Sequence, residues 1–437
     1  MEPLDRWVDR QYRHAAKAML MSVSPLGLVK HRPGFGQSIV PKQGSIVASP
    51  VLAAYDPDPD YFFHWYRDSA VVIDALRLLF EDGSVGADAL AQLGDFVRFS
   101  LSLQHLDGRA LLAAPDWRTR VAPDFTKFLR ADADVASVHG ETVAAETRVN
   151  PDGTLDISSW PRPQNDGPAM RALTLLRWER STRVDPELNA AVEVLVTADL
   201  AYTRKRWRES CFDIWEEEKG LHYYTLCIAA AALEAGAGWL QERGSAVEAR
   251  ALGTECAAIR RRLDTYWLED RGYYKSRVLE SGERSAKELD IAVILAAVHG
   301  SGGGTTHSVH DPRMHATLAR LEELFDADYP INRDRRPALA PAMGRYAKDR
   351  YYSGGAYYFS TLAAAEFCFR AAVGSSAAQD LVRRGDAFLE TVRRFTPPSG
   401  DLSEQFDKTT GVQTSARHLA WSYAAFISCI VARRAAG

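Results

Sequence analysis

The chain has 437 residues, of which 53 are basic and 57 are acidic, and its formal net charge is −4. Apolar residues make up 46% of it and charged residues 25%, values typical of a soluble globular protein. This composition excludes collagen-like, low-complexity and largely disordered chains. The nearly balanced charge also argues against nucleic acid as the main partner, because that partner requires a basic face.

The length alone would allow about three domains, but no linker rich in Pro, Gly or Ser divides the chain. We therefore expect one catalytic domain over residues 1–437, in which 24–66 form an irregular segment leading into the first motif. The N-terminus has no apolar core of a secretion signal, and no apolar run approaches ~18 residues. The five cysteines are odd in number and lack a C-x-x-C pair, which favours free, buried thiols. These features predict a cytoplasmic protein that does not span a membrane.

Helical periodicity dominates the chain. A first amphipathic helix is expected over 3–23, and segments apolar on all sides occur at 69–80, 168–178, 223–240, 289–298, 359–373 and 419–431. Between them lie segments with one apolar stripe and a charged face, at 88–106, 187–206, after Gly244, at 314–326 and at 376–395. A helix that is apolar all round is buried on every side, whereas a striped helix covers it from outside.

Six buried and six covering helices in strict alternation predict an all-α fold, the (α/α)6 barrel, with an inner ring of six helices inside an outer ring of six. The alternative is an irregular helical array or a solenoid, although no fixed-period repeat supports a solenoid. If the buried helices are parallel, their N-termini open at one end. Residues placed just before each buried helix would then meet in one pocket.

Unusual clusters of aromatic and charged residues occupy those positions. They lie at 61–68, 160–168, 212–220, 344–352 and 402–408, while 286–290, before the fourth buried helix, is the least informative. Each cluster alone has a plain structural explanation, since aromatic runs are usually core and adjacent charges usually form surface pairs. The recurrence of five such clusters, each just before a buried helix, instead favours a functional site that they form together.

The residue types in these clusters fit carbohydrate chemistry. Flat aromatic rings with polar rims suit sugar rings, and Arg67 with Asp68 offers donors and acceptors to paired hydroxyls. Glycoside cleavage requires two carboxyl groups, one protonated and one ionised. Glu216 or a neighbour supplies one and Glu404 the other. Because the three adjacent glutamates at 216–218 repel one another as anions, one of them should keep its proton to higher pH, and desolvation by Trp215 should act in the same direction. We expect only one of the three side chains to reach the glycosidic bond.

Several motifs in order resemble the glucoamylase family, glycoside hydrolase family 15, whose members are inverting exo-acting α-glucosidases on an (α/α)6 barrel. The similar stretches are 59–68, 162–169, 213–217, 344–346 and 403–408 through 415–417, so the resemblance covers most of the chain. It implies that Glu216 is the general acid and Glu404 the general base, with their carboxyl groups about 6.5–9.5 Å apart. It also implies substrate contacts by Arg67, Asp68, Tyr61, Trp65, Trp160, Trp215, Glu217, Arg345 and Tyr357.

Two departures leave the preferred linkage open. Pro161 stands where the family commonly has Gly, and 355–357 read Gly-Ala-Tyr where it commonly has Asn-Pro-Trp. We expect short oligosaccharides with α-1,4 or α-1,6 bonds as substrates, because no starch-binding module follows the last helix. An α-1,6 specialist or a trehalose hydrolase of the same family is the near alternative.

A different class is a catalytically inactive regulatory or sugar-binding subunit, which retention of both glutamates disfavours. A metal enzyme is less favoured, because His307, His310 and His315 lack a carboxylate or Cys that completes a ligand set and are expected in an exposed loop. We expect no metal, no cofactor, and a monomer or weak homo-oligomer.

Overall fold

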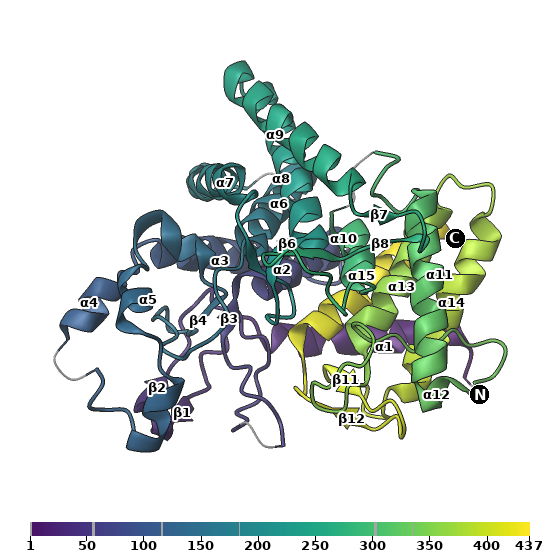
Figure 1. Cartoon of the computed structure of the whole chain (residues 1–437), viewed down its shortest axis with the longest axis horizontal. Helices are drawn as coiled ribbons and strands as arrows, with labels where there is room; N and C mark the ends of the chain where they lie inside the picture. Colours follow the sequence, from purple (N-terminus) through teal and green to yellow (C-terminus); the bar gives the residue numbers. More distant parts are fainter. Residues whose placement is uncertain (1, 55–56, 115–116, 183, 301–303, 334) are drawn as a thin grey trace.

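The computed structural model describes residues 2–54, 57–114, 117–182, 184–300, 304–333 and 335–437. Within these ranges the six buried segments form an inner layer of helices: α2 (Tyr66–Glu81), α6 (Asp166–Ser181), α8 (Tyr223–Glu242), α10 (Ala292–His299), α13 (Tyr358–Ala372) and α15 (Ala420–Ala436). Each inner helix contacts the next along the chain, and α15 contacts α2, so the ring is closed (Figure 1). A solenoid would leave its first and last helices apart, and the predicted (α/α)6 barrel is confirmed.

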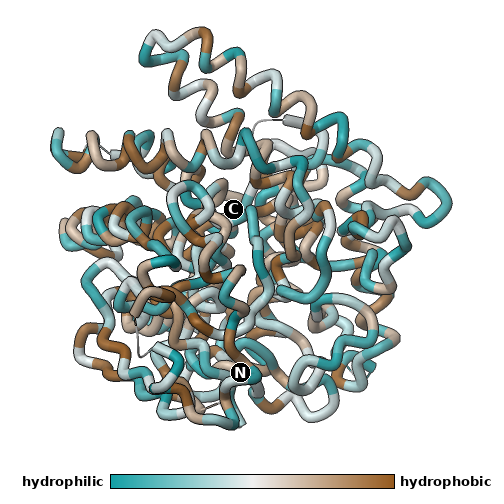
Figure 2. The backbone as a smooth tube through the Cα atoms, turned by 60° about the vertical axis from the view of Figure 1, so that its left-hand side comes forward, coloured by the Kyte–Doolittle hydropathy of each residue, from teal (hydrophilic) through white to brown (hydrophobic). Residues whose placement is uncertain are grey.

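Each covering helix packs against an inner one. The pairs join α1 (Leu4–Leu20) to α15, α3 (Asp88–Leu103) to α2, α7 (Pro186–Arg206) to α6, α9 (Ala246–Asp264) to α8, α11 (Pro312–Asp328) to α10 and α14 (Ala378–Phe395) to α13. Every residue of α13 except Arg370 is buried, whereas α14 buries a single stripe that includes Phe388 and Val392. Along the helices the tube changes repeatedly between hydrophilic and hydrophobic (Figure 2). The two layers therefore follow from the two kinds of hydrophobic pattern.

Local capping explains where the helices begin. The Asp185 carboxylate accepts a hydrogen bond from the Leu188 backbone N–H at 2.9 Å, and Pro186 occupies the first turn of α7. Helix α2 begins at Tyr66, three residues before its predicted start. Arg67 and Asp68 therefore lie in its first turn and not in the preceding loop, because charged side chains interrupted the apolar pattern on which the prediction rested.

Short antiparallel sheets connect the segments that precede the inner helices. Three of them are two-stranded and pair β1 (Lys30–Arg32) with β2 (Gln37–Ile39), β3 (His64–Trp65) with β4 (Arg148–Val149), and β7 (Trp267–Leu268) with β8 (Tyr273–Tyr274). Two are three-stranded: β6 (Lys219–His222) lies between β5 (Cys211–Phe212) and β9 (Arg277–Leu279), and β11 (Gln405–Phe406) lies between β10 (Ala356–Tyr357) and β12 (Gln413–Thr414). Short helices α4 (Gly108–Ala113), α5 (Asp132–Ala136) and α12 (Pro330–Arg333), and 3-10 turns η1 (Pro33–Phe35), η2 (Pro123–Phe128) and η3 (Gly140–Ala145), complete the described elements. The pairings β3–β4, β6–β9 and β10–β11 join segments far apart in the sequence, next to the starts of the inner helices α2, α8 and α13.

The histidine motif is not an exposed loop, so that expectation is wrong for two of its three members. His307 is buried, and its Nδ1 lies 2.8 Å from the Tyr223 hydroxyl and its Nε2 3.0 Å from Asp264. His315 lies within α11, and only His310 is exposed. Across the described residues, no three His, Cys, Asp or Glu side chains are arranged to hold a metal ion.

The cysteines are free and buried in the described structure, as predicted. Of the helices described here, none combines the length and the apolar character needed to cross a membrane.

Candidate active site

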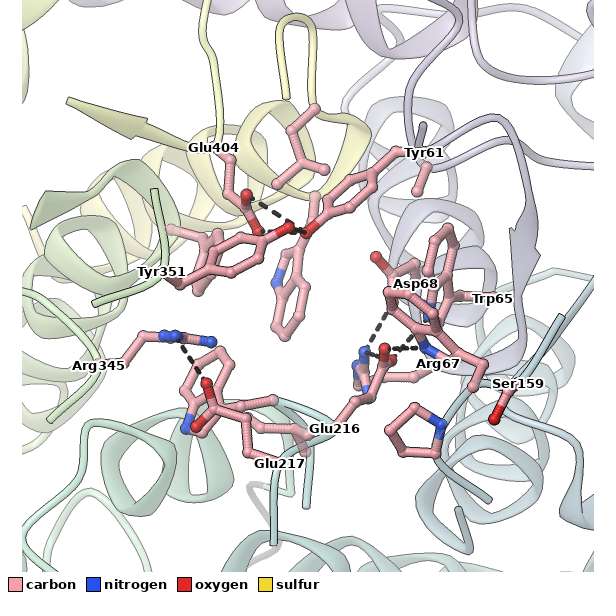
Figure 3. Close-up of a pocket in the computed structure, with 18 residues that line it drawn as sticks. Tyr61, Trp65, Arg67, Asp68, Ser159, Glu216, Glu217, Arg345, Tyr351 and Glu404 are labelled. Atoms are coloured by element: carbon pink, nitrogen blue, oxygen red, sulfur yellow. Dashed lines mark hydrogen bonds and ion pairs between the residues drawn. The ribbon is translucent and has the colours of Figure 1, made fainter. Parts of the chain in front are cut away.

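The segments before the inner helices meet at a cavity of about 350 Å³ (Figure 3). Ten of the predicted site residues line it: Tyr61, Trp65, Arg67, Asp68, Trp160, Trp215, Glu216, Glu217, Arg345 and Glu404. They come from loops and first turns associated with α2, α6, α8, α13 and α15. The convergence expected of parallel inner helices is therefore present in the structure.

Tyr357 is the exception, because it is 1% exposed and lies behind the cavity wall. Its ring packs 5.2 Å from that of Phe359, and its hydroxyl accepts a hydrogen bond from Gln405 Nε2 at 2.7 Å. Tyr351 lines the cavity instead, with its hydroxyl 2.8 Å from that of Tyr61. The sequence placed the aromatic residue correctly near the site but could not show which tyrosine faces the cavity.

A tight turn presents Glu216 to the cavity. The Asp213 carboxylate accepts hydrogen bonds from the backbone N–H groups of Trp215 and Glu217, each at 3.0 Å, and the Glu216 N–H donates to the Asp213 carbonyl at 3.0 Å. Glu216 has a φ of 64°, in the left-handed region that non-glycine residues seldom occupy. Such a conformation is maintained only where surrounding contacts fix it, and it is typical of functional sites.

Two indole groups bind the Glu216 carboxylate. Trp65 Nε1 donates to Oε1 at 2.7 Å, Trp160 Nε1 donates to Oε2, and Arg67 Nη2 lies 3.6 Å away. Burial nevertheless raises the pKa of Glu216, even though Arg67 opposes the shift. The expected result, a carboxyl group that keeps its proton to higher pH, is present. Its cause is burial, however, and not the neighbouring glutamates.

The neighbouring glutamates are neutralised by cations. Glu217 binds Arg345 at 3.0 Å and Lys287 at 2.5 Å, whereas Glu218 turns away to Arg277 at 2.9 Å. Glu217 lines the cavity beside Glu216. Two of the three crowded glutamates, Glu216 and Glu217, therefore line the cavity, as expected of residues predicted to contact the substrate, whereas Glu218 does not line it.

Glu404 lies on a different wall from Glu216 (Figure 3). The hydroxyl of Tyr61 donates to its Oε1 at 3.2 Å, and Ser415 Oγ donates to its Oε2. Burial raises the pKa of Glu404 to about 7, against the effect of these hydrogen bonds. Burial therefore raises the pKa values of both Glu216 and Glu404, and it also raises that of Asp68 in the same cavity.

Arg67 and Asp68 form a buried charged pair at the cavity. Arg67 Nη2 lies 3.1 Å from Asp68, and Nη1 lies 3.2 Å from Asp166. Within the described structure, Arg67 Nε and Asp68 Oδ2 have no aligned hydrogen-bond partner. Both side chains line the cavity, where they offer a charged donor and a charged acceptor to the hydroxyl groups of a ligand.

Sequence reasoning missed the residues that support the Glu216 turn. Arg277, 4% exposed, binds Asp213 at 2.5 Å and also binds Asp290, whose carboxylate accepts a hydrogen bond from Trp215 Nε1 at 2.8 Å. Burial raises the pKa of Asp290 to about 6. Trp421, also missed, lines the cavity. Asp290 belonged to the least informative cluster, and a single arginine in a strand carried no sequence signal.

Comparisons with known proteins identify the family and agree with the fold. Residues 144–381 and 373–431 match the family described as glycosyl hydrolases family 15. Glucoamylase 1 of Rhizopus oryzae is 26% identical, over 99% of this chain and 72% of its own, and a probable glucoamylase of Schizosaccharomyces pombe is 28% identical, over 99% and 92%. Among solved structures, the Hypocrea jecorina family 15 glucoamylase has a TM-score of 0.80 at 24% identity, covering 99% of this chain and 72% of the other. A glucoamylase of Saccharomycopsis fibuligera has a TM-score of 0.76 at 20% identity, covering 99% and 96%.

Proposed function

Because the chain belongs to glycosyl hydrolases family 15, we propose that it releases β-glucose from the non-reducing ends of short α-glucosides, with α-1,4 or α-1,6 bonds, by inversion. The observation that carries this proposal is the pair of buried carboxyl groups, Glu216 and Glu404, on different walls of one small cavity. Inverting hydrolysis requires a carboxylic acid and a carboxylate separated by enough space for a water molecule.

Glu216 acts as the general acid and protonates the glycosidic oxygen. Burial keeps its proton bound above the ordinary pH range of a glutamate, as a general acid requires. The indole N–H groups of Trp65 and Trp160 fix the orientation of the carboxyl group. A fixed carboxyl group loses little entropy when the transition state forms.

Glu404 acts as the general base and removes a proton from the attacking water. The hydroxyl groups of Ser415 and Tyr61 donate to its carboxylate, and both bonds favour the ionised form that a base requires. The water then attacks the face of the sugar opposite the departing group, and the product has the β configuration. Tyr61, which joins Glu404 to the sugar pocket, is positioned near the developing oxocarbenium ion.

The terminal glucose is held by Arg67 and Asp68, whose side chains line the cavity. Charged groups form stronger hydrogen bonds with hydroxyls than neutral groups do. Aromatic side chains on the surrounding walls, Trp65, Trp160, Trp215 and Trp421, pack against the sugar's apolar faces. Glu217 and Arg345, which bind each other at 3.0 Å, contact the sugar next to the cleaved bond.

Incubation with maltose, isomaltose, nigerose and trehalose tests the proposal when glucose release and the anomer formed first are followed by NMR. We expect β-glucose from maltose or isomaltose, and a 10²–10⁴-fold lower kcat in Glu404→Gln. Glu248→Gln, which alters an exposed glutamate on α9, should match the wild type. α-Glucose as the first product would contradict inversion. Turnover of trehalose alone or isomaltose alone would establish the specialised alternative, and sugar binding without turnover would indicate an inactive subunit.

A further inference from the structure

A second cavity, of about 460 Å³, lies between the two layers of the barrel. We call it the interlayer cavity; it is lined by parts of α2, α3, α6, α7 and η3. Helices α3 and α7 contact each other beside α6 (Figure 1). Tyr66 lines the interlayer cavity, whereas its neighbours Trp65 and Arg67 line the active site. The two cavities are therefore separated by the first turn of α2.

Buried polar groups without partners occur on two of the helices that line this cavity. Ser100 Oγ on α3 and Arg171 Nη1 on α6 are buried and have no hydrogen-bond partner among the described residues. Tyr66, on α2, also lines the cavity. A buried polar group left unpaired costs about 1–3 kcal/mol. Two such groups on the lining residues of one cavity, Ser100 and Arg171, indicate that it accommodates a polar molecule.

The charges around the interlayer cavity balance. Arg171 Nη2 binds Asp199 at 2.7 Å in the interior, and Lys205 binds Glu141 at 2.5 Å among its lining residues. An anion would meet the carboxylates of Asp199 and Glu141, and a cation would meet Arg171 and Lys205. This arrangement favours an uncharged ligand.

We propose that the interlayer cavity binds a neutral polyhydroxylated molecule of about monosaccharide size. The side-by-side Arg171 guanidinium and Asp199 carboxylate offer a donor and an acceptor to neighbouring hydroxyls. The rings of Tyr66 and Tyr202 provide flat apolar surfaces, which suit the apolar face of a sugar ring. The volume lies within the range of small-molecule sites. This site is separate from the active site and does not depend on the proposed hydrolysis.

Glucose is the probe for the first test. Crystals of the wild-type protein soaked in glucose should show a sugar in the interlayer cavity that contacts Tyr66, Ser100 or Arg171. Soaks in inorganic phosphate should leave the cavity without an anion. Water molecules alone in the glucose soak, or phosphate in place of glucose, would overturn the proposal.

Equilibrium dialysis with labelled glucose provides a second test in solution. Ala198→Trp adds a large side chain at an exposed lining position on α7 and should remove one bound glucose per chain. Ala190→Trp makes the same change at an exposed position of α7 outside the cavity lining and should leave the binding ratio unchanged. Ser100→Ala should weaken this binding about five-fold, as expected for the loss of one hydrogen bond. An equal ratio in Ala198→Trp and wild type would refute the site, and neither test depends on hydrolysis.

Discussion

The buried carboxyl group of Glu404 should reduce the stability of the folded protein at high pH. Its pKa rises from 4.5 in the unfolded chain to about 7 in the folded protein. Between these values the folded protein retains a proton that the unfolded chain releases, so folding stability falls as the pH rises. The penalty is absent below about pH 4.5 and complete above about pH 7.

Glu404→Gln removes this penalty because glutamine has nearly the same shape and does not ionise. A difference of about 2.5 pKa units corresponds to about 3 kcal/mol. The unfolding entropy of a 437-residue chain is about 0.9 kcal/mol per kelvin. The variant should therefore melt about 3 °C above the wild type at pH 8 and at the same temperature at pH 4, while its kcat falls.

Differential scanning calorimetry at both pH values measures this effect. Glu248→Gln is the control, since an exposed carboxylate on α9 has no burial penalty to lose. A Glu404→Gln protein that melts at or below the wild-type temperature at pH 8, or whose advantage does not grow with pH, would refute the reasoning. Glu404 would then not be a desolvated carboxylate.

Three further substitutions test other parts of the structure. Ser415→Ala removes a donor to the Glu404 carboxylate, so the acidic limb of the kcat/KM profile should move up by about one pH unit. Arg277→Met leaves buried carboxylates unpaired and releases the turn that carries Glu216. We expect the free energy of unfolding to fall by about 3–5 kcal/mol and kcat to fall more than ten-fold at a similar KM. Arg277→Lys should partly restore kcat. An unchanged kcat in the folded variant would contradict this positioning role. Gly167→Ala brings a Cβ to 2.6 Å from an α2 side chain, so chemical denaturation should show a loss of about 1–3 kcal/mol.

The hydrophobic pattern predicted most of the fold. Whether a helix is apolar all round or on one stripe depends on the order of residue types, and that order is written in the chain. The alternation of the two kinds of helix was sufficient to predict two layers and a common open end. Motif resemblance then identified Glu216 and Glu404, and the structure places both at one cavity.

The tertiary structure decided what depends on contacts between distant segments. Tyr351 rather than Tyr357 lines the cavity. The turn that carries Glu216 is supported by two residues far along the chain: Arg277 binds Glu218, 59 residues before it, and Asp290 binds Trp215, 75 residues before it. The main cause of the raised pKa of Glu216 also differs from the predicted crowding of glutamates: it is burial, which is a property of the packed structure. The order of residues along the chain specifies the hydrophobic periodicity of each helix, whereas the orientation, burial and ion pairing of side chains arise only when the ring of helices closes.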